Sequence, residues 1–265
     1  SSSVSVVFFT EPHASEYFAS KDENSVPPPR ICPWREKVKL LKNFGIDFAF
    51  FLQFNKSLKI MTPENFLDNI LAQLHLKHLI IGDDFRFGAQ RAGDFELLKN
   101  WGRNSGTNVI AHQTVSNNGE RISSTRIRQA LLNNDFDLAE KLLGRPYTFS
   151  GKVVFGQRLG RTIGVPTANL WIPKQRLPIA GVYAVKCFLA GKPYNGIANM
   201  GIRPTVDGSK PVLEIHIFNF NENIYGQRLT VEFINKLREE KKFDNIDLLK
   251  EQILQDISQA KKILE

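Results

Sequence analysis

The sequence is poor in cysteine and has no long apolar run. Its two cysteines, Cys32 and Cys187, are far apart and have no His or Cys partner at metal-ligand spacing, which argues against a disulfide bond and a zinc site. No segment approaches the roughly 18 uninterrupted apolar residues that a membrane span needs, and residues 1–4 lack the basic start of a signal peptide. These absences predict a cytoplasmic protein that does not enter a membrane.

Clusters of adjacent basic residues are also missing, although the chain is basic overall. The 265 residues carry a net charge of +8, which favours an anionic partner. Nucleic acid is the weaker choice, because the sequence has neither a basic cluster nor a strand of surface aromatic residues. With 42% hydrophobic and 23% charged residues, the chain can pack into two domains. Phosphate-bearing small molecules are therefore favoured, and a non-enzymatic nucleic-acid binder is the alternative.

The first half of the chain alternates short apolar segments with amphipathic ones. Thr62, Asp94, Ser124 and Asp135 stand where helices are expected to begin, and Gly144 stands where the last of these helices is expected to end. This alternation predicts a doubly wound parallel sheet in residues 1–145. Strands are expected at 4–9, 46–52, 78–81 and 107–111, and helices at 34–44, from 62 onward, at 94–101 and in two short segments before 144.

Beyond Pro146 the pattern changes to short strands at close spacing. Glycine and proline separate these strands, and the last residues, from about 246 to 264, carry an apolar stripe at helical spacing. We therefore expect residues 146–265 to form a small antiparallel β-barrel that is closed by a C-terminal helix, so that the fold class is α/β plus β. The expected strands are 151–155, 182–189, 196–200, 212–218 and 229–234.

A glycine-rich segment opens this second half. Gly151, Gly156 and Gly160 recur at short intervals, with Arg158 and Arg161 between or beside them. Glycine lets backbone N–H groups approach an anion closely, and arginine adds charge, so the segment is a candidate for binding the phosphates of ATP. An ordinary glycine-rich hairpin is the alternative interpretation.

Two oxygen-bearing side chains follow the glycine-rich segment. Thr167 and Asn169 are two residues apart, so in an extended chain they point to the same face. Mg²⁺ takes a few hard protein oxygens together with water and phosphate. The pair therefore predicts a Mg²⁺·ATP site, although Thr and Asn are each common in turns.

The segment at 212–218 alternates apolar and polar residues. Leu213 and Ile215 are expected to face the barrel core, which leaves Glu214 and His216 on the other face. Glu214 could then accept a proton from a substrate hydroxyl that attacks the γ-phosphate of ATP. A solvated strand face is the alternative, and we interpret His216 as structural.

Together, these motifs make the second half resemble the riboflavin kinase family over nearly its whole length. They include Gly-Val-Pro-Thr-Ala-Asn at 164–169, Asn-Met-Gly-Ile-Arg-Pro-Thr at 199–205, Leu-Glu-Ile-His at 213–216, Leu-Arg at 237–238 and Lys-Phe at 242–243. The resemblance implies that Thr167 and Asn169 hold Mg²⁺·ATP and that Glu214 is the base for the ribityl 5′-hydroxyl. It implies flavin contacts from Asn199, Gly201, Arg203, Thr205 and Arg238.

The first half is similar to the adenylyltransferase domain of bacterial bifunctional enzymes. The shared motifs are Thr-Glu-Pro-His at 10–13, Gly-Asp-Asp-Phe-Arg-Phe-Gly at 82–88, Ala-Gly-Asp at 92–94 and Ile-Ser-Ser-Thr-Arg-Ile-Arg at 122–128. The last of these places hydroxyls and arginines at a helix start, which favours anions, although a plain serine cap is the alternative. The implied nucleotide and flavin residues are His13, Gly82, Asp83, Asp84, Phe85, Ser123, Ser124, Thr125, Arg126 and Arg128.

One motif of this second family is missing. Its domain begins with a strand that leads into a His-x-Gly-His turn, which grips the ATP phosphates, and the sequence contains no such turn. By resemblance, the missing strand lies between the segments at 4–9 and 78–81. We therefore expect residues 1–265 not to make FAD, and we expect the natural protein to carry a further N-terminal segment that restores this reaction.

The leading hypothesis is an enzyme of flavin cofactor synthesis. Residues 146–265 would phosphorylate riboflavin with ATP to FMN, and the first domain, by resemblance, would adenylylate FMN with ATP to FAD and pyrophosphate. The alternative is a riboflavin kinase with a degenerate nucleotide-binding N-terminal domain. The expected partners are flavins, ATP and Mg²⁺, with weak self-association and without nucleic acid.

Overall fold

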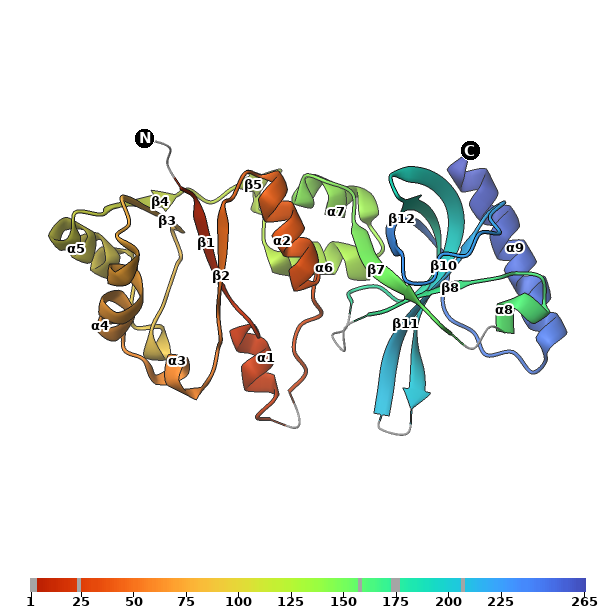
Figure 1. Cartoon of the computed structure of the whole chain (residues 1–265), viewed down its shortest axis with the longest axis horizontal. Helices are drawn as coiled ribbons and strands as arrows, with labels where there is room; N and C mark the ends of the chain where they lie inside the picture. Colours follow the sequence, from red (N-terminus) through yellow and green to blue (C-terminus); the bar gives the residue numbers. More distant parts are fainter. Residues whose placement is uncertain (1–3, 23–24, 157–158, 173–176, 206–207) are drawn as a thin grey trace. The chain divides into compact units, whose positions relative to one another are not determined.

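The chain divides into two compact units, each of which is described by itself (Figure 1). The computed structural model describes residues 4–22, 25–156, 159–172, 177–205 and 208–265, without the side chains of 159, 161, 203–205 and 208–210. The first unit comprises Ser1–Pro28 and Val38–Ile122, and the second comprises Pro29–Lys37 and Ser123–Glu265.

Parallel strand pairs form the centre of the first unit. Strand β1 (Val6–Thr10) pairs with β2 (Phe48–Leu52), and β3 (His78–Gly82) pairs with β4 (Asn108–His112), both in parallel. This confirms the predicted parallel α/β class, but within the described residues the two pairs are separate sheets. The intervening elements are α1 (Ala14–Ala19), α2 (Trp34–Asn43), α3 (Lys56–Ile60), α4 (Pro63–Phe66), η1 (Leu67–Leu71), η2 (Ala72–Leu74), η3 (Ala89–Arg91), α5 (Phe95–Ser105) and the hairpin β5 (Ser116–Asn117) and β6 (Glu120–Arg121).

Helix caps in the first unit follow the predicted pattern. The Thr62 hydroxyl accepts a hydrogen bond from the Asn65 backbone N–H at 3.2 Å, and the Asp94 carboxylate accepts one from Leu97 at 3.0 Å. Each cap satisfies a donor that the first helical turn leaves open. Behind these caps, the apolar faces of the helices enclose a core of Leu67, Leu71, Phe87 and Leu98.

The second unit contains a closed barrel with the strand order β10-β11-β8-β7-β12-β9. All neighbouring strands are antiparallel, which confirms the predicted barrel. Helices α6 (Ser124–Leu132) and α7 (Phe136–Leu143) precede the barrel, and α8 (Leu159–Thr162) lies between its first two strands. The strands are β7 (Thr148–Val154), β8 (Ala168–Leu170), β9 (Gly181–Leu189), β10 (Lys192–Thr205), β11 (Gly208–Ile217) and β12 (Arg228–Arg238).

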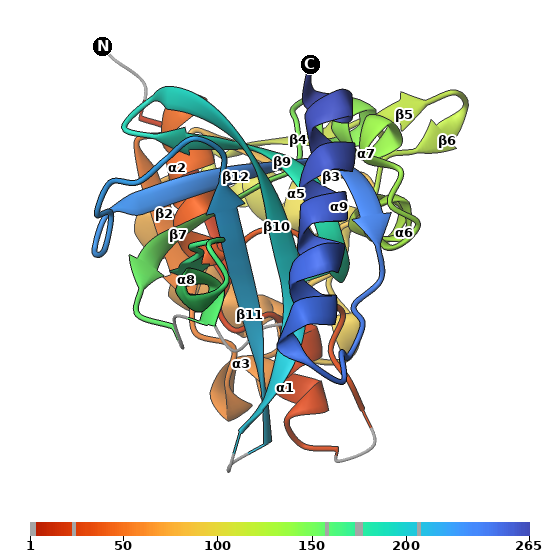
Figure 2. The same cartoon turned by 90° about the vertical axis from the view of Figure 1, so that its right-hand side faces the viewer.

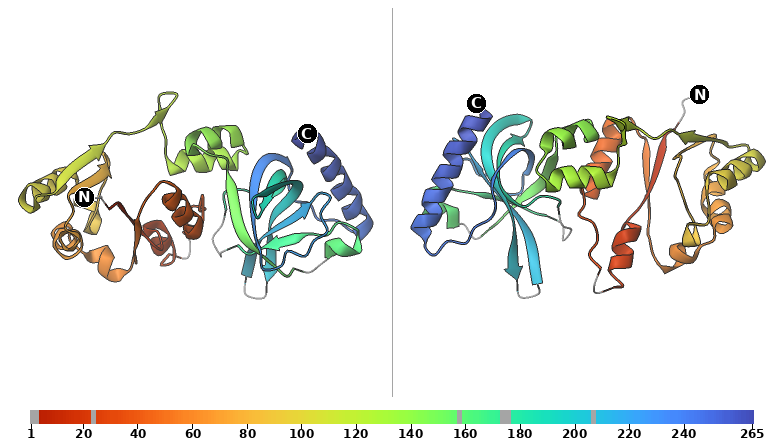
Figure 3. Two further views of the ribbon diagram at one scale, coloured as in Figure 1. Left: turned by 45° about the horizontal axis from the view of Figure 1, so that its top comes forward. Right: turned by 180° about the vertical axis from the view of Figure 1, so that it is seen from behind.

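Helix α9 (Ile246–Leu264) covers one outer side of this barrel (Figures 2 and 3). Its bounds match the predicted helix, and Asn245 caps its start by accepting a hydrogen bond from Leu248 at 2.9 Å. The apolar stripe packs through Ala260 and Ile257 against Ile197 and Phe218. The helix therefore adds a second apolar layer outside the barrel, whose interior is filled by fully buried residues such as Leu213.

Two local predictions need correction. Ser123, rather than Ser124, caps α6, because the Ser123 hydroxyl accepts from the Arg126 backbone N–H at 3.2 Å. Two adjacent serines give equivalent sequence signals, so the pattern could not choose between them. Strand β8 was not predicted, because three residues are too short to show an alternating pattern. The predicted cap Asp135 and the end at Gly144 (φ 68°) are confirmed.

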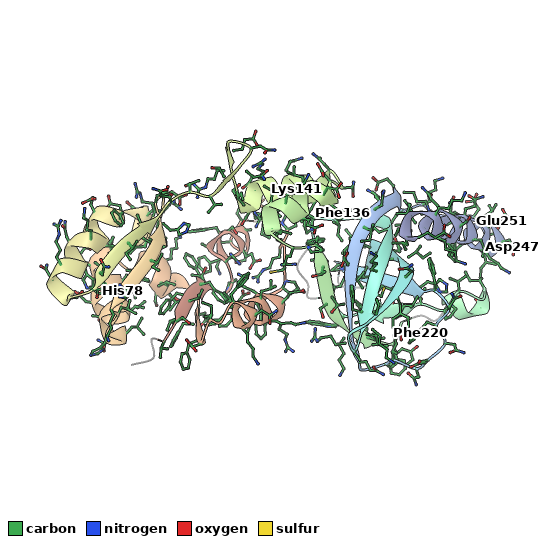
Figure 4. All side chains as sticks on the ribbon, turned by 90° about the horizontal axis from the view of Figure 1, so that it is seen from above. His78, Phe136, Lys141, Phe220, Asp247 and Glu251 are labelled. Atoms are coloured by element: carbon green, nitrogen blue, oxygen red, sulfur yellow. The ribbon has the colours of Figure 1, made fainter. Side chains whose placement is uncertain are left out.

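Residues before the barrel also belong to its packing. Phe136 of α7 lies between that helix and the barrel strands (Figure 4). The centroid of its ring is 5.8 Å from the ring centroid of Tyr183 and 6.4 Å from that of Phe233. Glu36, far away in sequence, accepts hydrogen bonds from the Thr148 hydroxyl and the Ser150 backbone N–H, both at 3.2 Å. Because of such contacts, residues 29–37 and 123–145 belong to the same compact unit as the barrel. The predicted domain boundary between residues 145 and 146 stays a prediction.

We expect a fragment that begins at Ser123 to be more stable than one that begins at Arg145. The shorter fragment loses Phe136, and removal of a buried aromatic side chain typically costs about 3–5 kcal/mol. Urea unfolding of the two fragments measures this difference in the free energy of unfolding. Equal midpoints would show that α6 and α7 do not contribute to barrel stability.

Candidate functional site

Three neighbouring barrel strands carry a row of polar residues. Asn199 of β10 stands opposite Glu214 of β11, and Glu214 stands opposite Asn169 of β8. Residues directly opposite each other in antiparallel strands project from the same face, with Cβ atoms about 5 Å apart. The residues on either side of Glu214, Leu213 and Ile215, are fully buried in the barrel. The polar row therefore lies on the outer face, as predicted for Glu214.

A cavity of about 230 Å³ lies along this outer face and reaches helix α9. One part of its wall is apolar and includes Val182, Ile197 and Ile253. The polar residues that line it come from β10, β11, β12, the loops before β8 and after β12, and α9: Thr167, Asn199, Glu214, His216, Arg238, Glu240, Lys241 and Asp256. The fold thus brings four of the predicted kinase residues, Thr167, Asn199, Glu214 and Arg238, to one cavity.

A second cavity, of about 390 Å³, lies beside the first. Its wall includes Thr167, Ala168, Asn221 and Tyr225, together with Phe220, which Figure 4 labels on the barrel. Thr167 lines both cavities. A group bound near Thr167 could therefore touch ligands in both cavities.

The glycines are required for close packing around Asn169 and the following turn. A Cβ at Gly156 would overlap the Asn169 side chain, and one at Gly160 would overlap the Val165 carbonyl. Gly151 lies within β7, where a Cβ would be 3.1 Å from the Leu170 Cβ, and it lines neither cavity. Arg158 lies outside the described residues, as does the side chain of Arg161. Phosphate binding by this segment stays a prediction.

Asn169 and Thr167 both carry a side-chain oxygen of the kind that Mg²⁺ prefers, and their role as ligands stays a prediction. Asn169 is 7% exposed and fits into the space that the missing Gly156 side chain leaves. Thr167 is two residues earlier, directly before β8, and it lines both cavities, whereas Asn169 lines neither. Within the described residues, no group of three His, Cys, Asp or Glu side chains could hold a metal. Two neutral oxygen ligands would suit an ion that is completed by water and phosphate oxygens.

His216 joins the strand of Glu214 to the turn before Thr167. Its Nδ1 lies 2.8 Å from the Pro166 carbonyl oxygen. A carbonyl only accepts, so Nδ1–H must donate. Burial lowers the pKa of His216, the Pro166 hydrogen bond opposes this with a smaller effect, and the Lys261 charge adds a still smaller lowering. This supports the predicted structural role, because a neutral, hydrogen-bonded ring holds the two segments together.

Arg238 is fixed by an acidic residue that the sequence analysis did not identify. Its guanidinium binds Asp256 of α9 through Nε and Nη2, with distances of 2.8 to 3.0 Å. Asp256 stands among the apolar residues of the helix stripe, four residues before Ala260. A single carboxylate in such a stripe was the signal that could have revealed it, because a buried charge requires a partner.

Glu240, a second acidic residue of the cavity wall, forms a hydrogen bond with Asn199 of the polar row. The Asn199 side-chain N–H donates to Glu240 at 3.1 Å, and a Cβ at Gly201 would overlap the Glu240 carboxylate. The other side-chain atom of Asn199, Oδ1, is buried and has no hydrogen-bond partner among the described residues. Such an acceptor suits a donor from a ligand, since leaving it unpaired is unfavourable. The side chains of Arg203 and Thr205 lie outside the described part.

In the first unit, the predicted loop residues lie at the carboxyl end of β3. Gly82 ends that strand, and Asp83 accepts hydrogen bonds from Thr114, which lower the pKa of the Asp83 carboxyl. Asp84 forms a 2.7 Å ion pair with Arg121. Phe85 is 38% exposed and stacks on Phe87. Ligands of open parallel sheets bind at this edge, but these carboxylates are already engaged by protein groups.

The remaining predicted residues of the adenylyltransferase site fall in both units. His13 stands at the start of α1, where its backbone N–H donates to Glu16 at 3.2 Å. Ser123, Ser124, Thr125 and Arg126 form the start of α6 in the second unit. Arg128 donates from Nε to the Pro29 carbonyl at 2.7 Å, so part of its guanidinium is used within the protein. A role of these residues in nucleotide binding stays a prediction.

The fold and site define a two-domain transferase, and comparison with known proteins identifies which kind. A family model for riboflavin kinase matches residues 143–264, and one for FAD synthetase matches residues 1–126. The bifunctional riboflavin kinase/FMN adenylyltransferase of Haemophilus influenzae is 43% identical over 96% of this chain and 82% of its own length. That of Escherichia coli K12 is 42% identical over 95% and 80%. The chain belongs to this family.

A solved structure shares the overall fold. The crystal structure described as a macrolide-efflux protein from Streptococcus pneumoniae is 33% identical, with a TM-score of 0.78 over 97% of this chain and 83% of that chain. In the chain of residues 1–265, by contrast, no helix among the described residues is both long and apolar enough to cross a membrane.

Proposed function

We propose that the barrel transfers the γ-phosphoryl group of ATP to the 5′-hydroxyl of riboflavin, which gives FMN and ADP. The observation that carries this proposal is the row Asn199–Glu214–Asn169, which sets the Glu214 carboxylate of the cavity wall beside Asn169. In the reaction, the bond between the ribityl oxygen and the γ-phosphorus forms while the bond to the ADP oxygen breaks. The hydroxyl proton passes to the Glu214 carboxylate.

Each of the two cavities suits one of the two substrates. Riboflavin suits the cavity that contains Glu214, because its apolar wall accommodates a flat ring system and its acidic residue meets the hydroxyl. ATP suits the neighbouring cavity, with its terminal phosphate directed toward Thr167, which both cavities share. Donor and acceptor then meet at one residue, as direct phosphoryl transfer requires.

Thr167 and Asn169 would hold Mg²⁺. When bound, the ion neutralises charge on the phosphate oxygens of ATP. Asn169 contributes its amide oxygen and Thr167 its hydroxyl, and Gly156 keeps the space that Asn169 needs. His216 keeps the Thr167 turn beside the Glu214 strand through its bond to Pro166.

For the N-terminal region, we propose adenylyl transfer from ATP to FMN, which gives FAD and pyrophosphate. Matches to both family models favour two activities over the alternative of a kinase with a degenerate first domain. Weak self-association, the absence of nucleic-acid binding and a cytoplasmic location stay expectations.

Chromatography of the flavins tests both assignments. The protein is incubated with ATP and Mg²⁺ and with either riboflavin or FMN, and riboflavin, FMN and FAD are quantified. The kinase proposal expects FMN from riboflavin. A folded protein that leaves riboflavin unchanged would refute the kinase assignment, and FAD from FMN would refute the sequence-based expectation that residues 1–265 do not make FAD.

A further inference from the structure

The guanidinium of Arg238 is held on several sides. Asp256 accepts from Nε and from Nη2, and the Glu239 backbone carbonyl accepts from Nη1 at 2.9 Å. The Phe243 ring lies against the same group, with its centroid 5.8 Å from the guanidinium carbon. An arginine at a strand end normally keeps many rotamers, whereas this one has a single defined orientation.

These contacts do not use all donors of the guanidinium. An arginine has five N–H groups, and Asp256 and Glu239 engage three of them. Within the described residues, one N–H on each terminal nitrogen has no partner. Arg238 is 18% exposed and lines the cavity that contains Glu214, so these donors can meet a ligand there.

Asp256 is better explained by a role in orientation than by one in stability. Its side chain is 3% exposed on the apolar side of α9, and Gln252 donates to its Oδ1 at 3.0 Å. Replacement of a buried ion pair by apolar residues is often neutral or stabilising, so such a pair is weak evidence for a stabilising role. A charge at this place does, however, fix the direction of the bidentate arginine fork.

We propose that Asp256 is a positioning residue for the flavin substrate. It orients Arg238 so that the two remaining N–H groups donate to oxygen atoms of riboflavin in the cavity. This role rests on the proposed kinase function, because it concerns how the cavity that contains Glu214 binds riboflavin. The preset arginine lowers the entropy lost on binding, because its rotamers are already restricted in the free protein.

Substitution Asp256→Asn tests the proposal in the full chain. The amide keeps the size of the side chain but loses the charge and one acceptor for the fork. We expect the riboflavin Kd, measured by quenching of flavin fluorescence, and the KM for riboflavin to rise roughly tenfold, as expected for loss of a charged hydrogen bond. The KM for ATP and kcat should change by less than about threefold. An unchanged riboflavin affinity would overturn the proposal.

Two further variants separate orientation from helix packing. Ile263→Ala loosens α9 at a residue that packs on the barrel but lines neither cavity, and it should leave the KM for riboflavin unchanged. Arg238→Lys keeps the positive charge without the fork and should reproduce the selective riboflavin defect even if Asp256→Asn does not fold. Equal loss of riboflavin affinity in Ile263→Ala and Asp256→Asn would reject a specific role. Absence of FMN formation by the parent would instead refute the kinase function, while the binding data would still test Asp256.

Discussion

Replacement of Glu214 by Gln is expected to reduce FMN formation by about 10²–10⁴-fold, because removal of a general base typically costs this much. Glutamine keeps the shape of the side chain in the polar row but cannot accept the hydroxyl proton. ATP and riboflavin affinities should therefore stay close to those of the parent. Steady-state kinetics with chromatographic detection of FMN, together with flavin fluorescence binding, measures both quantities.

Glu232→Gln provides a matched control for this variant. Glu232 lies on β12 of the same barrel, it lines neither cavity, and burial raises the pKa of its carboxyl. Neutralising it should leave FMN formation within about twofold of the parent, since Glu232 lies outside both cavities that hold the proposed substrates. Glu214→Gln activity within a few-fold of the parent would reject Glu214 as the base.

The second large effect is expected at the proposed magnesium ligands Thr167 and Asn169. Asn169→Ala removes an oxygen ligand and should raise the Mg²⁺ concentration needed for half-maximal activity by at least about tenfold, since even outer-shell changes cost about 10–100-fold in metal affinity. Gly156→Ala should have the same effect, because the added methyl group displaces the Asn169 side chain. Nucleotide affinity measured with and without Mg²⁺ gives a readout that does not depend on turnover.

An exposed asparagine on the neighbouring part of the barrel serves as the control for these two variants. Asn235 lies on β12 and lines neither cavity, so Asn235→Ala should keep the parent Mg²⁺ dependence. The interpretation of Asn169 as a ligand is contradicted if Asn169→Ala and Asn235→Ala titrate with Mg²⁺ alike. If Gly156→Ala alone behaves like the parent, the Gly156 contact is not needed to place Asn169.

Local sequence signals predicted those parts of the fold that depend on near neighbours. The cap Asp94, the end at Gly144 and the full length of α9 follow from side chains within one or two turns of each other. The alternation around Glu214 likewise predicted which face each side chain takes. The two separate strand pairs of the first unit were not predicted, because pairing between strands depends on contacts that periodicity does not encode.

The difference between near and distant neighbours in sequence also explains which residues of the site were missed. Thr167 and Asn169 are close in sequence, so the pair could be proposed from spacing alone. The Arg238–Asp256 pair joins a strand end to the middle of a helix, and Glu36 reaches β7 across more than 100 residues. Such partners are set by how the barrel and its surrounding segments pack. A charged residue within an apolar stripe, as at Asp256, is the sequence feature that points to them.

The central claim is that the barrel transfers a phosphoryl group from ATP directly to riboflavin. The most direct measurement is a single-turnover reaction with ATP labelled in the γ-phosphate, Mg²⁺ and riboflavin, followed by separation of the flavins. We predict that the label appears in FMN with the parent protein and that Glu214→Gln forms labelled FMN about 10²-fold or more slowly. Label released only as inorganic phosphate, or FMN formed equally fast by both proteins, would contradict the account.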